Sequence, residues 1–212
     1  MGKIESSAEL SPDGVYRYRL DRRWDNSLPR MVFLMLNPST ADASSDDPTL
    51  RRCISFARSL GHGSLSVVNL YALRTPNPRE LRDHPDPVGP LNDRYIAETV
   101  RDADLVVAGW GNNAWDPRRV DQVRSLLPGP LHALGVTKGG NPGHPLYLKG
   151  DSQLVKWADA VSASAGGDAL GEIRSLTRQI HALEARRDLL AEAARRDGSI
   201  PASELELALS NE

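Results

Sequence analysis

The sequence predicts an α/β fold in which helices cover both faces of a mostly parallel central sheet, a three-layer α/β/α arrangement. Two observations lead to this prediction: short apolar runs typical of buried strands recur along the chain, and segments with helical patterning separate them. The chain has 212 residues, of which 40% are hydrophobic and 25% charged. That composition is ordinary for a globular protein, and the length is enough for one substantial domain with an extension.

Four apolar runs are expected to form the strands of this sheet. They are MVFLML (31–36), LSVVNL (65–70), DLVVAGW (104–110) and PLHALG (130–135). Strands of a parallel sheet are buried on both faces and therefore read as nearly continuous apolar segments. Because ligands bind beyond the carboxyl ends of such strands, the residues that follow each run are candidates for a functional site.

Three segments between the predicted strands are expected to be helical. They are residues 48–61, 92–103 and 116–127. In the first, Leu50, Ile54 and Ala57 share one face, and Gly61 suits the C-terminal cap. The other two segments open with an Asn or Asp residue, which are favoured N-caps. The alternation of strands and helices is what favours the parallel arrangement.

The C-terminal part of the chain has a different pattern. We expect a domain over residues 15–160 and a helical extension over residues 168–212, joined by a Ser-, Ala- and Gly-rich hinge at 162–171. Apolar residues recur at steps of three and four between Ile173 and Ala194, as in a coiled coil, and a shorter helix over 199–209 completes a hairpin. We expect a homodimer through the long helix, with packing of the helix on its own domain as the alternative.

Composition excludes several classes of protein. The net charge of −2 argues against binding of nucleic acid through bulk electrostatics, although a local basic face remains open. The single cysteine, Cys53, excludes an internal disulfide and a cysteine-based zinc site. No apolar run approaches the roughly 20 residues that cross a bilayer, so no membrane partner and a cytoplasmic location are expected. No dinucleotide or phosphate-loop motif and no metal-ligand spacing is present, so neither a cofactor nor a metal is expected.

Polar residues gather after each of the four predicted strands. In chain order the candidates are Asn37, Thr40, Asp42 and Asp47; Asn69, Tyr71 and Arg74; Trp110; and Lys138 and His144. Taken singly each has a purely structural explanation, since Asp and Thr are routine helix caps and a tryptophan suits a core. Because the carboxyl ends of parallel strands meet at one edge of a sheet, we expect Asn37, Asn69 and His144 to converge in one cleft.

The motifs that contain these residues resemble those of known proteins. The series LNPSTAD (36–42), VVNLYALRTP (67–76), AGWG (108–111) and GHPLYL (143–148) resembles a bacterial domain family of uncharacterised function over about residues 15–157. More distantly, the series is similar to the motif order of the uracil-DNA glycosylase superfamily, with a first-strand loop ending in Asn-Pro or Asp-Pro, a strand ending in Asn, a Leu-Trp-Gly-like strand and a His-Pro loop. The matching positions are Asn37-Pro38, Asn69, Trp110-Gly111 and His144-Pro145. This resemblance implies a uracil-DNA glycosylase-like fold.

The second resemblance also implies a function, that of an N-glycosylase-like hydrolase acting on a base, modified or not, in DNA or in a nucleotide. Such a site holds a flipped base by its edge and stabilises negative charge on the departing base. By the resemblance, Asn37 would position the attacking water. Asp42 and Asp47 are the nearby carboxylates that would activate this water as a general base. His144 would donate a hydrogen bond to the departing base.

The remaining candidates would bind the substrate. Asn69 would read the base edge and Tyr71 would supply a stacking face, with Thr40 and Trp110 beside them. Arg74 and Lys138 would clamp the phosphate of a nucleotide. Two other functions stay open: a non-catalytic module that binds a nucleotide or nucleic acid in the same pocket, and an interaction protein that works through its C-terminal helices.

Overall fold

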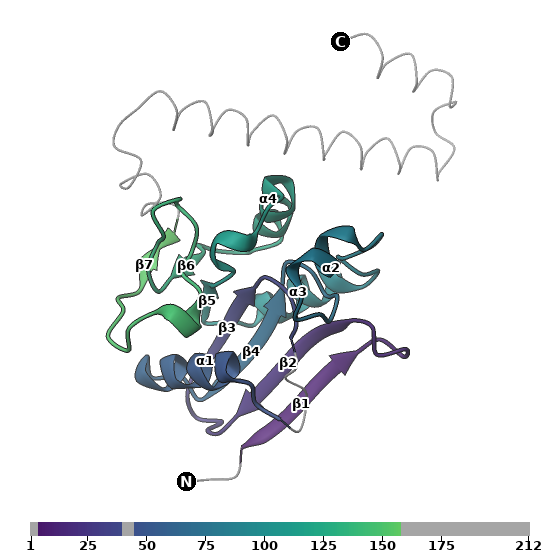
Figure 1. The fold of residues 1–212 in the computed structure, drawn as a ribbon. Coiled ribbons are helices and arrows are strands. Elements are labelled where there is room, and N and C mark those ends of the chain that lie inside the picture. Colours follow the sequence, from purple (N-terminus) through teal and green to yellow (C-terminus); the bar gives the residue numbers. More distant parts are fainter. Residues whose placement is uncertain (1–3, 40–44, 158–212) are drawn as a thin grey trace, which may run out of the picture. The chain divides into compact units, whose positions relative to one another are not determined.

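The computed structural model describes residues 4–39 and 45–157, which form a seven-stranded sheet with helices packed against it (Figure 1). The strands are β1 (Glu5–Leu10), β2 (Arg17–Arg23), β3 (Arg30–Met35), β4 (Ser64–Asn69), β5 (Leu105–Ala108), β6 (His132–Ala133) and β7 (Val155–Lys156). The helices are α1 (Pro48–Ser59), α2 (Pro78–Asp83), α3 (Asn92–Arg101) and α4 (Pro117–Ser125), with two short 3₁₀ helices, η1 (Gly111–Asn113) and η2 (Pro145–Tyr147). The predicted extension at 168–212, and with it the predicted dimer contact, lies outside the described residues.

The strands of the sheet follow the order β1-β2-β4-β3-β5-β6-β7. The central pairs β4–β3, β3–β5 and β5–β6 are parallel, whereas β1–β2, β2–β4 and β6–β7 are antiparallel. The sheet is therefore mixed, and the prediction of a mostly parallel sheet is wrong outside its centre. For β1 and β2 the physical reason is the short connection between them, since a parallel pair needs a crossover of a dozen residues or more.

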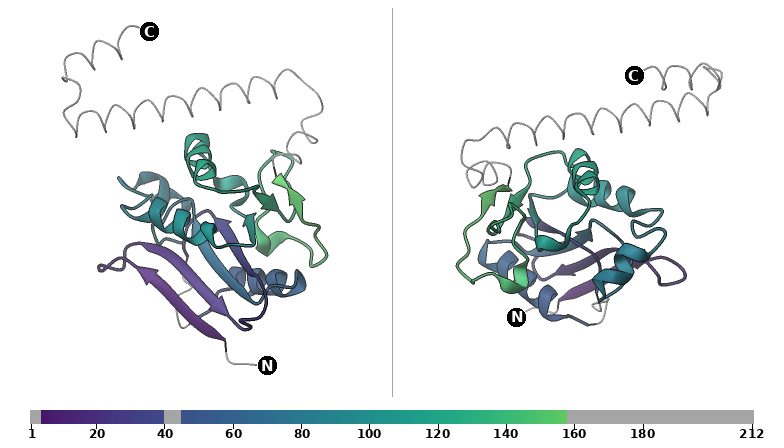
Figure 2. Two further views of the ribbon diagram at one scale, coloured as in Figure 1. Left: turned by 180° about the vertical axis from the view of Figure 1, so that it is seen from behind. Right: turned by 45° about the horizontal axis from the view of Figure 1, so that its top comes forward.

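Successive residues of the central strands enter two separate apolar clusters, one on each face of the sheet. On one face Phe33 of β3 belongs to the same cluster as Phe56 of α1. On the other face Leu34 belongs to a cluster that contains Ile96 of α3 and Val123 of α4. The two views of Figure 2 show α1 and α3 on opposite sides of the strands. This burial on both faces explains why the central strands read as continuous apolar runs.

The predicted helices are found as α1, α3 and α4. Asp47 caps α1 by accepting a hydrogen bond from the Leu50 N–H, and Asp116 caps α4 in the same way. Asn92, expected at the start of its helix as a cap, instead lies inside α3, and its side chain makes no capping hydrogen bond. No helix among residues 4–39 and 45–157 is both long and apolar enough to cross a membrane.

The strand β3 is the point at which the chain changes its direction across the sheet. From β3 the chain passes through α1 to β4 on one side, and then through α3 to β5 on the other side. In open α/β sheets a crevice forms outside the carboxyl ends of the strands at such a switch point. The ends of β3, β4 and β5 therefore mark the place where a ligand site is expected.

Candidate functional site

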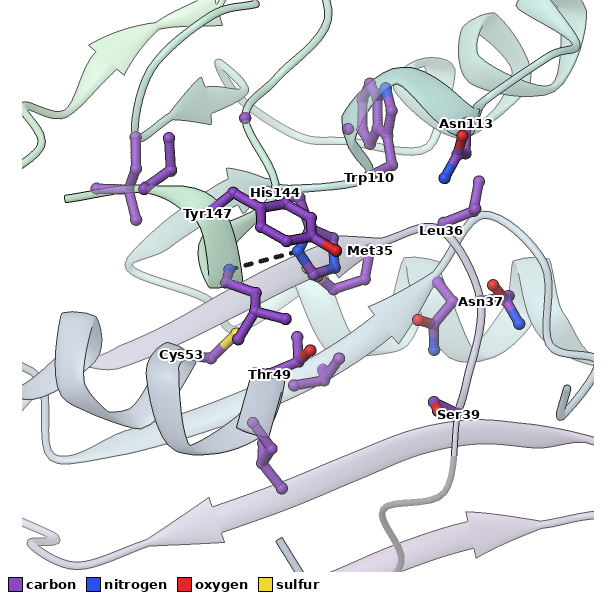
Figure 3. Close-up of a pocket in the computed structure, with 18 of the residues that line it drawn as sticks. Met35, Leu36, Asn37, Ser39, Thr49, Cys53, Trp110, Asn113, His144 and Tyr147 are labelled. Carbon is purple, nitrogen blue, oxygen red and sulfur yellow. Dashed lines mark hydrogen bonds between the residues drawn. The ribbon is translucent and has the colours of Figure 1, made fainter. Parts of the chain in front are cut away.

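A cavity of about 990 Å³ opens at the carboxyl edge of the central strands (Figure 3). Its walls include residues that follow β3, β4, β5 and β6. Five residues suggested by the sequence line it, namely Asn37, Asp47, Asn69, Trp110 and His144. The structure thus brings Asn37, Asn69 and His144 into one cavity, whose volume falls in the range of small-molecule sites, about 300–1,000 Å³.

Asn37 lies just beyond β3, and the loop after β4 orients its amide. The amide nitrogen donates to the carbonyl oxygens of Thr75 at 2.7 Å and Pro38 at 3.0 Å. Because only the NH₂ group can face these acceptors, the Oδ1 atom is left as an acceptor on the other side. Figure 3 shows this oxygen turned toward the cavity. Asn37 can therefore orient a water molecule or hydroxyl group, although its amide cannot act as a base.

Asn69 ends β4 and lines the cavity, yet it is only 1% exposed. Its side-chain Nδ2 is buried without a hydrogen-bond partner, a state that costs about 1–3 kcal/mol. The backbone, in contrast, is well held. Asn92 donates to the carbonyl oxygen of Asn69 at 3.0 Å, and Arg119 donates to that of Leu70 at 2.7 Å. The strand end is fixed by the protein, while the side chain keeps a donor for a ligand.

His144 forms the N-cap of η2. Its Nδ1 atom accepts a hydrogen bond from the Leu146 N–H at 3.3 Å. Burial lowers the pKa of His144 below its ordinary value, and the negative charge of Asp47 opposes this shift in part. The imidazole is therefore neutral near pH 7, and because Nδ1 acts as an acceptor the proton lies on Nε2. His144 thus has an N–H donor that its own backbone contact does not use.

The loop that carries His144 approaches β3 closely because residue 109 is a glycine. A Cβ atom at Gly109 would lie 2.8 Å from the Met35 Sδ and 2.9 Å from the Pro145 Cδ. Any larger residue would force β3 and this loop apart. Gly109 is therefore what allows the His144-Pro145 segment to form one wall of the cavity beside the end of β3.

Asp47 is the one acidic residue among the described residues that line the cavity. Its Oδ1 atom accepts the Leu50 N–H at 2.7 Å, which is the capping contact of α1. The second carboxylate oxygen is left for water or a ligand. No group of three or more His, Cys, Asp and Glu side chains suited to a metal ion is found in the part of the chain that the structure describes.

Trp110 follows β5 and is mainly a core residue. It is only 2% exposed, and its ring packs edge-on against Trp157 with the ring centroids 5.1 Å apart. Both rings belong to the apolar cluster beneath α3 and α4. Trp110 borders the cavity from this cluster, and its main contribution is to support the wall.

Comparison with known families adds one finding. Residues 17–146 match a family described as a protein of unknown function, DUF1643. The chain belongs to this family. The match confirms the resemblance to an uncharacterised domain family, and it contains Asn37, Asp47, Asn69 and His144. Neither a curated protein nor a solved structure matches the chain, so the likeness to the uracil-DNA glycosylase superfamily stays a prediction.

Several residues suggested for substrate binding are not placed in the cavity of this DUF1643 domain. Tyr71 is only 3% exposed and stacks on Trp115 with the centroids 4.6 Å apart, and burial raises its pKa to about 12. Its ring is thus not available to a ligand base. Arg74 donates to the carbonyl oxygen of Gly14 at 3.0 Å, and Lys138 is exposed; neither lines the cavity. Thr40 and Asp42 lie outside the described residues.

The structure adds residues to the DUF1643 cavity that the sequence did not single out. Arg17, the first residue of β2, lines the cavity and is only 4% exposed. Cys53 of α1 also lines it, and burial raises the pKa of its thiol, which keeps the sulfur neutral and unreactive. Asn112 accepts hydrogen bonds from Thr137 at 2.8 Å and Asn141 at 3.2 Å, and so orders the glycine-rich loop after β6.

Tyr147 lies at the rim of the cavity, beyond the end of the DUF1643 match. It is 82% exposed, and its ring lies beside that of His144, with the ring centroids 5.4 Å apart (Figure 3). An aromatic ring with this exposure is free to stack on a ligand base at the mouth of the cavity. The motif GHPLYL contains it, but a tyrosine in a loop gives no sequence signal of its own.

Proposed function

We propose that the chain is an N-glycosylase-like hydrolase that releases a base, modified or not, from a nucleotide in DNA or from a free nucleotide. We further propose that residues 15–160 adopt the three-layer fold of the uracil-DNA glycosylase superfamily. The observation that carries the proposal is the convergence of Asn37, Asn69 and His144 in one cavity at the switch point of the sheet. All three residues lie at positions that match the superfamily motifs. By the resemblance Asn37 would position the water, and the chemistry of their side chains suits Asn69 to reading the base and His144 to stabilising the leaving group.

The departing base is the group for which His144 is suited. When the bond between a base nitrogen and the sugar C1′ breaks, its electron pair leaves with the base, which becomes negatively charged. A donor that is neutral before the reaction stabilises this charge as it develops. The lowered pKa of His144 and the acceptor role of its Nδ1 supply such a donor at Nε2.

The water that attacks C1′ is assigned to Asn37 and Asp47. The free Oδ1 of Asn37 accepts a hydrogen bond from the water and orients it. The water oxygen then bonds to C1′ while one of its protons passes to the carboxylate of Asp47. Asn69 reads the edge of the base through its unpartnered Nδ2, and the exposed ring of Tyr147 stacks at the mouth.

Base release from defined substrates tests this proposal. Purified protein is incubated with oligonucleotides that carry a panel of normal and modified bases, in single and double strands, and with free nucleotides, and the free base is quantified. His144→Ala is expected to lower the rate about 10²- to 10⁴-fold. His84→Ala is the matched control, because the Nδ1 of His84 also accepts a backbone N–H two residues on, from Asp86, at 3.1 Å, but His84 lies outside the cavity.

One observation favours a second function, that of a non-catalytic module that binds a nucleotide or nucleic acid. Asp47 already serves as the cap of α1, and a carboxylate held in this way has less freedom to act as a base. In that case the panel yields binding to the cavity without release of any base, and His144→Ala weakens affinity only. Release of a base by the wild-type protein, lost in His144→Ala, excludes this alternative.

A further inference from the structure

The strand β2 contains an irregularity that determines on which face of the sheet the side chain of Arg17 lies. Residues three apart in a regular strand lie on opposite faces, yet Arg17 and Leu20 both line the cavity. The pairing of β1 with β2 accounts for this: Glu9 pairs with Arg19 while the next residue, Leu10, pairs with Arg17. Tyr18 is therefore an extra, unpaired residue, a β-bulge. Bulges of this kind re-aim side chains and are common beside functional sites.

The bulge directs the guanidinium of Arg17 to the cavity face of β2, the strand that neighbours β4 and its last residue, Asn69. β2 is the neighbour of β4 in the sheet, and both Arg17 and the end of β4 contribute to the cavity wall. Arg17 is 4% and Asn69 1% exposed, so both side chains are buried in the wall of the cavity. The apolar residues Leu20, Met35 and Val67 of the neighbouring strands line the same cavity and are buried. In-plane N–H donors between apolar walls are complementary to a flat heterocycle that presents hydrogen-bond acceptors on one edge.

We propose that this end of the cavity selects a 6-oxopurine, that is, a base of the guanine, hypoxanthine or xanthine type. The inference rests on the proposed function and names the substrate class of the same site. The planar guanidinium of Arg17 matches the adjacent acceptors O6 and N7 of such a base. Asn69 complements the rest of the edge, with its Nδ2 donating to O6 and its Oδ1 accepting from N1–H. The guanidinium has five donors, which is enough to bind an acceptor of the protein and the base at the same time.

Other ligands fit these residues less well. Adenine presents an amino group at position 6, which places donors against the donors of Arg17 and Asn69. A phosphate group needs several donors around each oxygen and gains nothing from Leu20, Met35 and Val67. Discrimination by one bidentate arginine contact corresponds to about a 10- to 100-fold preference for a 6-oxopurine over adenine.

The test is equilibrium binding of paired ligands that differ only at the purine 6-position. Inosine and guanosine are compared with adenosine, and oligothymidylates with one inosine or guanine are compared with the same strand with one adenine, each titrated into the full chain. The wild-type protein is expected to prefer the 6-oxopurine about 10- to 100-fold. Arg17→Met is expected to abolish the preference, Arg17→Lys to keep part of it, and the exposed Arg23→Met on the same strand to leave it unchanged.

The outcomes separate this inference from the proposed function. Equal affinity of the wild-type protein for the inosine and adenosine ligands overturns the inference without any variant, even when a base is released and the proposed function stands. The inference is also overturned if nucleoside 5′-monophosphates or inorganic phosphate bind more tightly than the nucleosides and Arg17→Met removes this difference for every base. Arg17 would then be a phosphate contact. No binding of any nucleoside or oligonucleotide removes the proposed function, and this inference with it.

Discussion

Asn92 offers the sharpest test of how the end of β4 is held in position. This residue is fully buried in α3, and its Nδ2 atom donates to the carbonyl oxygens of Asn69 at 3.0 Å and Leu70 at 3.2 Å. Asn92→Leu keeps the side-chain volume nearly constant and removes both donors. The carbonyl of Leu70 retains the Nε of Arg119 at 2.7 Å, so the loss falls on the carbonyl of Asn69.

The expected loss of stability follows from these contacts. A buried carbonyl deprived of its donor costs about 1–3 kcal/mol. Removal of the Asn92 Oδ1, which is buried without a partner in the wild-type protein, offsets part of that cost. We therefore expect the free energy of unfolding to fall by about 1–2 kcal/mol. Because Asn69 lies directly on this contact, affinity for the cavity ligand is expected to fall as well.

Urea denaturation of the full chain measures the effect. A loss of this size lowers the denaturation midpoint by about 0.5–1.5 M urea. Asn26→Leu, at an exposed asparagine, is the matched control and is expected to change stability by less than about 0.5 kcal/mol. An Asn92→Leu protein with the wild-type midpoint would refute the argument that α3 fixes the end of β4.

Three further predictions follow from the cavity and from the sequence. Asp47→Ser keeps a good helix cap but removes the carboxylate, so the urea midpoint is expected to stay within about 0.5 M while base release falls about 10²- to 10⁴-fold; unchanged release would mean that Asp47 only caps α1. Because the pKa of His144 is lowered from 6.5, the folded state binds a proton at His144 less readily than the unfolded state does. The folded state is therefore favoured most when His144 is neutral in both states, and its free energy of unfolding decreases as the pH falls through the lowered folded-state pKa. The thermal midpoint is expected to drop between about pH 7.5 and about pH 5, and to drop less in His144→Gln; equal drops would contradict the assignment. Removal of residues 168–212 is expected to convert a dimer into a monomer by light scattering, and a truncated chain that keeps the dimeric mass would refute the predicted helix contact.

The parts of the fold that the sequence predicted are those in which one residue pattern has one physical meaning. The runs at 31–36 and 65–70 are β3 and β4 because strands buried on both faces must be apolar throughout. The hairpin of β1 and β2 was missed because β2, RYRLDRR, is rich in charge. Its inward Arg22 is 2% exposed and pairs with Asp46 at 2.8 Å, a long-range contact that no local pattern shows.

The candidate site was predictable to the extent that it depends on strand ends. Asn37, Asn69 and His144 lie where the carboxyl-end rule placed them. Tyr71 does not line the cavity, because the strand β4 ends at Asn69. The ring of Tyr71 packs into the apolar cluster that also contains residues of α3 and α4. Arg17 was not predicted because it reaches the cavity only through a bulge, and a bulge depends on the pairing of two strands rather than on one of them.

A structure of the protein with a bound nucleoside tests most directly whether this one cavity binds the base. We expect the base between the end of β4 and η2, with an acceptor within hydrogen-bond distance of the Asn69 Nδ2 and another group facing the Nε2 of His144. A base bound elsewhere, with the Asn69 amide still unpartnered, would contradict the claim that this cavity is the base-binding site.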